Sequence, residues 1–136
     1  MATGVARTAT GISVSIARDA ALVRTVRLIA AAVARRTGQD EEFVEEVRLA
    51  VGEACALMVG EDGSGTGPVT VRLSIDDRLT VDVVAAGRVA VGDSPDSDVD
   101  GVEPWALLRG LIEDLSVDQG AESTTLSMSW PVTAPV

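Results

Sequence analysis

Several residue types on which most enzymes depend are missing from this sequence. It contains no histidine, no lysine and no tyrosine, and its single cysteine is Cys55. Without histidine and lysine the chain lacks imidazole acid–base chemistry, the commonest zinc ligand, a Schiff-base amine and the phosphate-binding lysine of a P-loop. We therefore expect few ordinary enzyme mechanisms to be open to this protein.

Disulfides and long apolar runs are absent as well. A lone cysteine inside an apolar helical pattern excludes an internal disulfide framework and agrees with a reducing compartment. The apolar stretches are interrupted by charge well before the ~20 residues that a membrane span requires. Residues 1–10 lack the apolar run of a secretory signal. We expect a cytoplasmic protein without a membrane segment.

The charge of the chain is acidic and unevenly distributed. The formal net charge is −10, although residues 1–39 contain six arginines and only one acidic residue, Asp19. The acidic excess therefore belongs to residues 40–136. An acidic body repels phosphate backbones, so we expect no direct binding of nucleic acid and consider a protein partner the better fit.

The hydrophobic periodicity predicts one α+β domain over residues 1–136. Alternation of period two predicts strands over residues 12–16, 69–75, 79–84 and 123–130. Helical spacing and capping residues predict helices over residues 18–37, 40–59 and 104–115. Between the third strand and the last helix, residues 87–103 read as a long polar loop. This order predicts a two-layer sandwich, a mixed sheet with its helices on one face.

Two short motifs carry weak ligand signals. The glycines of residues 63–67 follow a helix and lack a lysine, so we interpret this segment as a connector and not as a phosphate loop. Asp96, Asp98 and Asp100 match the first half of a calcium loop, but Leu107 occupies the twelfth position, where a glutamate is needed. We expect no metal site.

The first predicted helix carries a candidate binding patch. Arg24, Arg27 and Arg35 lie opposite its apolar face, and Leu28 falls near Arg24 and Arg35. A leucine bordered by arginines is typical of a protein-binding surface. The alternative is a solvated face on which arginine stems shield one leucine.

The second predicted helix contains the most informative segment. Its residues Leu49-Ala50-Val51 and Glu53-Ala54-Cys55 closely resemble a helix of the anti-sigma-factor serine kinases, the RsbW and SpoIIAB group of the GHKL, or histidine-kinase-like ATPase (Bergerat), fold. Residues 107–115 resemble the late helix of that family. The predicted order of elements over residues 12–130 also suits the fold.

The departures from that family concern its nucleotide site. By resemblance, an asparagine four residues after the glutamate holds Mg²⁺, and Leu57 stands there instead. The Asp-x-Gly that reads adenine corresponds to Ala85-Ala86-Gly87, of which only Gly87 remains. Around Pro104 the phosphate-binding Gly-x-Gly is lost, and proline has no N–H to donate. Glu53, by resemblance the base that activates a substrate serine, is kept, but alone it cannot position phosphoryl transfer.

The resemblance and these departures predict a degenerate anti-sigma factor. It would sequester an alternative sigma factor by protein–protein binding and be released by an anti-anti-sigma STAS-domain protein. ATP binding and kinase activity are expected to be lost, so no cofactor is expected. The predicted contact surface comprises Arg24, Arg27, Leu28 and Arg35, and homodimerisation is an alternative use of that face.

Two other functions stay open from the sequence. The first is an active serine kinase that phosphorylates the anti-anti-sigma protein, with Glu53 as base and ATP and Mg²⁺ as cofactors. The second is an accessory subunit that shares only the fold and binds another ligand.

Overall fold

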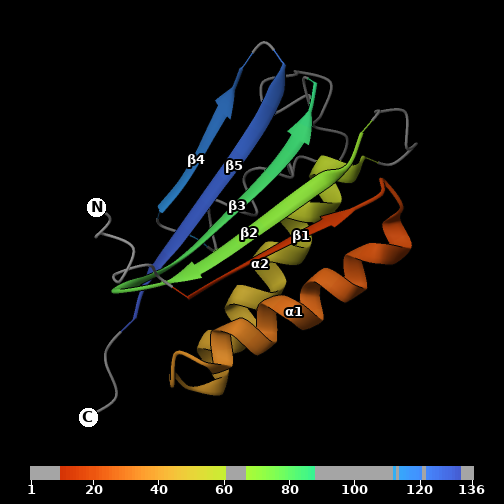
Figure 1. Ribbon diagram of the computed structural model, residues 1–136. Helices are drawn as coiled ribbons and strands as arrows, with labels where there is room; N and C mark the ends of the chain where they lie inside the picture. The colour runs from red at the N-terminus through yellow and green to blue at the C-terminus, as the bar shows by residue number, and fades with distance from the viewer. Residues whose placement is uncertain (1–9, 61–66, 88–111, 113, 121, 133–136) are drawn as a thin grey trace, which may run out of the picture.

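The computed structural model describes residues 10–60, 67–87, 112, 114–120 and 122–132. These residues form one five-stranded sheet in the order β1-β2-β3-β5-β4, with two α-helices against one face (Figure 1). The strands are β1 (Thr10–Ile16), β2 (Val69–Ile75), β3 (Arg78–Ala86), β4 (Asp114–Gln119) and β5 (Ser123–Pro131). A 3-10 turn, η2 (Ala20–Leu22), precedes the helices α1 (Val23–Arg35) and α2 (Glu41–Val59). The predicted two-layer α+β architecture is therefore confirmed.

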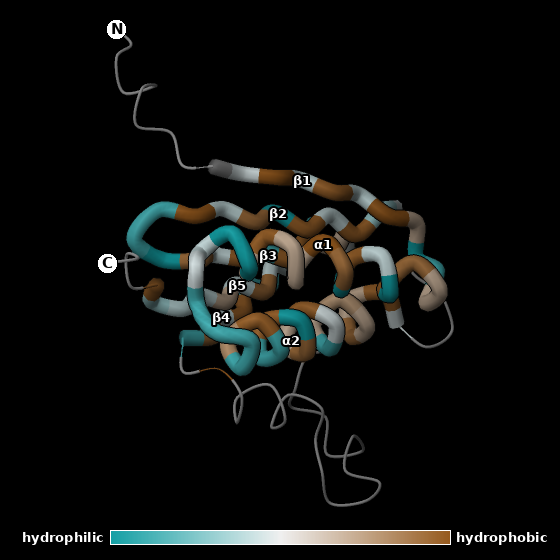
Figure 2. Tube along the Cα trace, turned by 90° about the horizontal axis from the view of Figure 1, so that it is seen from below, coloured by the Kyte–Doolittle hydropathy of each residue, from teal (hydrophilic) through white to brown (hydrophobic). Residues whose placement is uncertain are grey.

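Alternating side chains divide the sheet into an inner and an outer face. In β3 and β5 every second residue is buried, and in β2 the alternating set is buried except for the half-buried Ile75; the buried residues include Val71, Val81 and Leu126. The residues between them are mainly serine and threonine and point away from the helices. Figure 2 shows the same alternation of apolar and polar residues along the strands. The hydrophobic core therefore lies between this sheet and the two helices.

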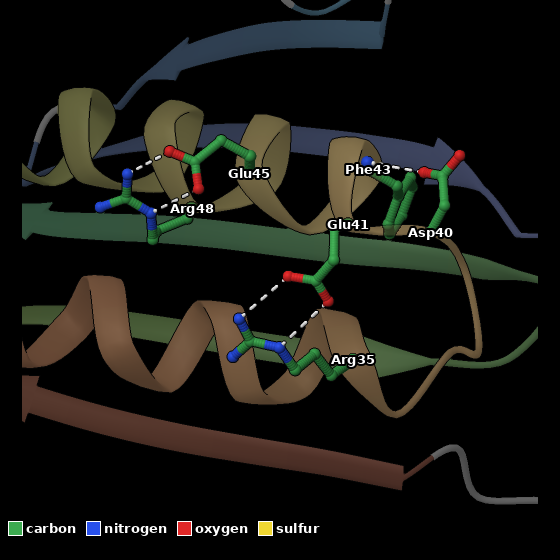
Figure 3. A network of polar contacts seen from close by, with 6 residues as sticks. All are labelled: Arg35, Asp40, Glu41, Phe43, Glu45 and Arg48. Atoms are coloured by element: carbon green, nitrogen blue, oxygen red, sulfur yellow. Dashed lines mark hydrogen bonds and ion pairs between the residues drawn. The ribbon is translucent and has the colours of Figure 1, made fainter.

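Capping residues fix where α2 begins and ends. The Asp40 carboxylate accepts a hydrogen bond from the backbone N–H of Phe43 at 2.9 Å (Figure 3), and Glu41 and Glu42 occupy the first turn, where the helix dipole favours negative charge. Gly60 ends the helix at a φ of 82°, which a residue with a side chain rarely adopts. The bounds predicted for this helix are confirmed.

The sheet differs from the predicted mixed arrangement. All four strand pairings that the structure describes are antiparallel. β3 and β4 run in the same direction, because each pairs antiparallel with β5, but β5 separates them. The reason for the difference is β4, a strand that the sequence pattern does not predict.

β4 also corrects the end of the third predicted helix. Asp114 and Leu115, assigned to a helix over residues 104–115, belong to this strand. Leu115 and Val117 are the two apolar residues on the inner face of this strand, and both are half-buried. Two apolar residues give too weak an alternation to be distinguished from the end of a helix. Residues 104–111 lie outside the described residues, as do the glycines 63 and 65 and the candidate calcium loop.

Candidate functional site

The motif of α2 places Glu53 and Leu57 on one side of the helix, because residues four apart share a face. Glu53 is half-exposed, whereas Leu57 is half-buried and packs against the hydrophobic core. Glu46, two turns before Glu53, accepts a hydrogen bond at 2.9 Å from the indole Nε1 of Trp130 in β5. This side of α2 therefore lies toward β5 and carries a carboxylate, Glu53, that is open to solvent.

The end of β3 holds the residues that correspond to the adenine-reading motif. Ala85 is fully buried and contributes only a methyl group. Gly87 has a φ of 79°, donates its N–H to the carbonyl of Glu122 at 2.7 Å and accepts the Thr124 hydroxyl at 3.1 Å. Both polar backbone atoms of Gly87 therefore bind other parts of the fold. At the position of the motif's aspartate, Ala85 offers adenine no carboxylate.

These residues do not fit a magnesium–nucleotide site of the kind that the resemblance implies. Mg²⁺ requires oxygen ligands, and Leu57 supplies hydrocarbon at the position of the expected amide. In the part of the chain that the structure describes, His, Cys, Asp and Glu side chains form no group of three or more that could hold a metal ion. Pro104, the third departure, lies outside the described residues.

Arg18 forms hydrogen bonds to three elements that meet near the end of β3. Its guanidinium donates hydrogen bonds to the carbonyls of Met58 at 3.3 Å, Gly67 at 3.1 Å and Ala86 at 2.7 Å. These carbonyls belong to the end of α2, the approach to β2 and the end of β3. Sequence reasoning missed this clamp, because nothing in the spacing around Arg18 predicts acceptors so distant in the chain.

Cys55 lies on another side of α2, and its thiol is unreactive. Its side chain is buried, and this burial raises the pKa of the thiol to about 11, although the nearby Arg27 charge acts in the opposite direction. A protonated, buried thiol is neither a nucleophile nor a metal ligand. The sequence interpretation of Cys55 as a small buried hydrophobe agrees with this position.

The outer surface of the helix layer carries two exposed leucines. Leu28 of α1 is 64% exposed and Leu49 of α2 is 41% exposed. Arg24 is exposed, and Arg35 forms an ion pair with Glu41 at 3.3 Å (Figure 3). Leu49 enters the sequence analysis only as part of a motif, although its place outside the apolar stripe of α2 could have identified it as exposed.

Arg27 departs from its expected position. The sequence predicts it on the solvent side of α1, but its side chain is half-buried and lies over Gly52 of α2. A Cβ added to Gly52 would lie 2.8 Å from Cγ and 3.0 Å from Cδ of Arg27. The missing side chain of Gly52 therefore makes room for Arg27, and the turns that carry Leu28 and Leu49 are neighbours. We call Arg24, Leu28, Arg35 and Leu49 the helix patch.

The described helices show no membrane segment, since neither is long and apolar enough to cross a bilayer.

An acidic residue of α2, Glu45, is paired with an arginine on the surface of the helix. Glu45 and Arg48, one turn apart, form an ion pair beside the helix patch (Figure 3), and this pairing lowers the pKa of the Glu45 carboxyl.

The family model described as "Histidine kinase-like ATPase domain" matches residues 16–130. A solved structure of the RsbU and RsbW domains of Rv1364c from Mycobacterium tuberculosis is similar, with a TM-score of 0.70 and 18% sequence identity. The similarity covers 93% of this chain and 33% of that chain, so this chain spans about a third of that protein. Curated proteins gave no match. At this identity the structural likeness shows a shared fold.

Proposed function

Because the chain belongs to the histidine kinase-like ATPase domain family, we propose that it uses the fold of that family to bind a protein and does not transfer phosphate. One observation carries this proposal. The fold is kept, while Leu57 and Ala85 place hydrocarbon where the anti-sigma-factor kinases, by resemblance, place oxygen atoms. Phosphoryl transfer depends on charge neutralisation and positioning, which these side chains do not supply.

The partner proposed is an alternative sigma factor, held until an anti-anti-sigma STAS-domain protein competes for the chain. Support comes from the α2 motif of residues 49–55, which resembles the anti-sigma-factor kinases, and from the shared fold with a structure that includes an RsbW domain. The absence of oxygen-bearing side chains at Leu57 and Ala85 agrees with regulation through protein binding without phosphorylation.

The helix patch is the proposed contact surface. Burying a leucine as exposed as Leu28 stabilises a complex by about 1–2 kcal/mol, and Leu49 adds a second apolar contact on the neighbouring turn. Arg24 at the margin attracts acidic groups of a partner. Since Arg35 is paired with Glu41 and Arg27 packs on Gly52, Leu28 and Arg24 contribute most to this surface.

Binding to candidate sigma factors tests the contact surface. We expect Leu28→Asp combined with Arg24→Ala to weaken the complex by at least about tenfold, because an apolar anchor becomes a charge and a cation is removed. The control Ser116→Asp adds one negative charge, as Leu28→Asp does, at an exposed position on the opposite face of the molecule. Isothermal titration measures Kd for each variant, and an unchanged Kd for the double variant would refute the surface.

The second candidate function is a serine kinase of the anti-anti-sigma protein, and the half-exposed Glu53 is the observation that favours it. A carboxylate at this position would accept the proton of the attacking serine. If this function holds, the wild-type chain phosphorylates a STAS protein with ATP and Mg²⁺, and Glu53→Gln abolishes the phosphorylation without changing the unfolding midpoint. We expect no phosphorylation by either protein.

A further inference from the structure

An open hollow lies on the helix side of the sheet, at the end of β2 away from the positions of the adenine-reading motif. In the strand register Val69, the first residue of β2, lies opposite Ala85, whereas Ile75 is the last residue of this strand. The hollow has a volume of about 270 Å³ and is bordered by β1, β2 and the end of α1, which are neighbours in Figure 1. It is lined by Ile12, Val33, Arg36, Leu73 and Ile75.

The apolar lining of this hollow is aliphatic. Four of the five lining residues are valine, leucine or isoleucine, and none of the five is aromatic. Val33 and Leu73 are buried, whereas Ile12 is 43% exposed and so is open to a ligand. Branched aliphatic side chains pack against a flexible hydrocarbon chain through many small dispersion contacts and offer no flat surface on which a ring could stack. The apolar part of a ligand that fits here is therefore an alkyl chain.

Arg36 adds a positive charge to the same hollow. Its side chain is exposed, and among the residues that the structure describes its guanidinium takes part in no ion pair. The end of α1 does not neutralise this charge with free carbonyls, because those of Val33 and Ala34 each accept a backbone hydrogen bond at 3.1 Å. The guanidinium is therefore available to an anionic group of a ligand.

The charges around the hollow also favour an anion, although the chain as a whole carries a net charge of −10. Residues 1–39, which include β1 and α1, contain six arginines and a single acidic residue. Asp76 follows the lining residue Ile75 directly, but its carboxylate accepts the backbone N–H of Arg78 at 3.0 Å within the turn between β2 and β3. Local charge of this sign attracts an anionic ligand.

We propose that this hollow binds a free aliphatic carboxylate, with the alkyl chain against the four apolar residues and the carboxylate on the guanidinium of Arg36. Hydrogen bonds from arginine to a carboxylate are charge-assisted and can be bidentate. The hollow is smaller than the clefts of roughly 300–1,000 Å³ that hold drug-sized ligands, so a chain of about eight carbons suits it. This inference is independent of the proposed function, because it uses neither the nucleotide positions nor the helix patch.

Methyl NMR locates the site, because the chain contains only five isoleucines. With their δ1 methyl groups labelled, titration with octanoate should shift the signals of Ile12 and Ile75, which line the hollow. The signals of Ile16, Ile29 and Ile112 should keep their positions, because these residues do not line it. Single isoleucine-to-valine substitutions assign the five signals. Shifts confined to the second group would overturn the proposal.

Isothermal titration tests the role of the charge. We expect one octanoate to bind per chain and Arg36→Gln to weaken this binding by about tenfold, because a charge-assisted contact is lost. The matched control is Arg72→Gln, which removes the same charge at an exposed position on the outer face of β2 and should leave the Kd unchanged. 1-Octanol has the same chain without the carboxylate, so its binding should not respond to Arg36→Gln.

The apolar lining has its own readout in the same titration. Ile12→Ala should weaken octanoate and 1-octanol by similar factors, since both chains lose the same contact. Each methylene added between hexanoate and octanoate should raise the affinity by up to about fourfold, as expected for burial of a CH₂ group.

Three results of the titration would overturn the proposal. The first is no binding of octanoate to the folded wild-type chain. The second is an equal loss of binding in Arg36→Gln and Arg72→Gln, which would mean that the carboxylate does not contact Arg36. The third is an affinity for octanoate that falls as the protein concentration is raised, which would show that a second copy of the chain covers the hollow.

Discussion

At the scale of single residues, Gly52 and Arg27 define how closely the two helices approach. A glycine inside a helix is less favourable than alanine by roughly 0.5–1 kcal/mol. In this protein the side chain of Arg27 packs against the backbone of Gly52. Three of its atoms lie too close to Gly52 for a Cβ to fit there. The unfavourable residue is therefore explained by a contact with a neighbouring helix.

This contact predicts a substitution whose sign depends on its background. With Arg27 present, we expect Gly52→Ala to lower the free energy of unfolding by about 1 kcal/mol, because the arginine must leave its place. In an Arg27→Ala background the same substitution should raise it by roughly 0.5–1 kcal/mol, since only helix propensity remains. Urea unfolding of the four proteins measures both effects. Equal effects in the two backgrounds would show that Arg27 does not fill this space.

Cys55 predicts how stability depends on pH. Burial raises the pKa of its thiol from an ordinary 9.0 to about 11. Well below pH 9 the thiol is protonated in both the folded and the unfolded protein, so it adds no pH dependence there. Between pH 9 and 11 only the unfolded protein loses this proton, so stability should fall as the pH rises. Urea midpoints across this range measure the fall.

The missing residue types make this measurement unusually clear. The chain contains no lysine and no tyrosine, the side chains that ordinarily titrate between pH 9 and 11. Cys55→Ala should therefore remove the slope and leave the urea midpoint level over this range. A slope that persists in Cys55→Ala would mean that another group causes it.

Individual positions differ in how far the sequence predicts them. The exposure of Leu28 could be predicted, because it lies off the apolar stripe of its own helix. The position of Arg27 could not, because it depends on a glycine in another helix. Leu57 could be recognised as unable to bind Mg²⁺ from its chemistry alone, whatever its packing.

At the scale of elements, Arg18 links α2, β2 and β3 where their ends meet. It makes three hydrogen bonds to carbonyls of residues far apart in the chain. We expect Arg18→Met, which keeps an apolar stem, to lower the free energy of unfolding by about 2 kcal/mol. Arg18→Lys should restore little, because one ammonium group cannot reach three separated acceptors.

A second arginine provides the control for Arg18. Arg72 is exposed on the outer face of β2, and Arg72→Met should change the free energy of unfolding by no more than about 0.5 kcal/mol. Urea unfolding measures both. If Arg18→Met and Arg72→Met have the same effect, the clamp does not stabilise the fold.

Elements with a strong apolar pattern were predictable, and the weak one was not. The predicted bounds of β2 and α2 hold, because alternation in the first and capping by Asp40 and Gly60 in the second mark both ends. β4 has only two inward apolar residues and follows a segment with helical spacing. Because β4 was not predicted, the sheet was expected to be mixed. In the structure β3 and β4 run in the same direction, but β5 lies between them and pairs antiparallel with both.

At the scale of the whole molecule, the chain keeps the fold of its family, while its residues at the nucleotide positions differ from those that the resemblance implies. The core between sheet and helices is continuous, and Leu57 packs against it at a position where, by resemblance, an asparagine would serve a ligand. An apolar side chain packed at this position adds buried hydrophobic surface and so contributes to the stability of the core. The family fold could be predicted from the α2 motif and the order of elements. The outward patch over both helices could not, because it depends on how the helices pair.

Isothermal titration of the folded chain with ATP and Mg²⁺ tests the central claim most directly. Loss of oxygen atoms at Leu57 and Ala85 predicts no binding heat up to millimolar ATP, from a protein whose cooperative urea unfolding shows that it is folded. Magnesium-dependent binding with a micromolar Kd would contradict this account and place phosphoryl transfer, with Glu53 as base, ahead of partner binding alone.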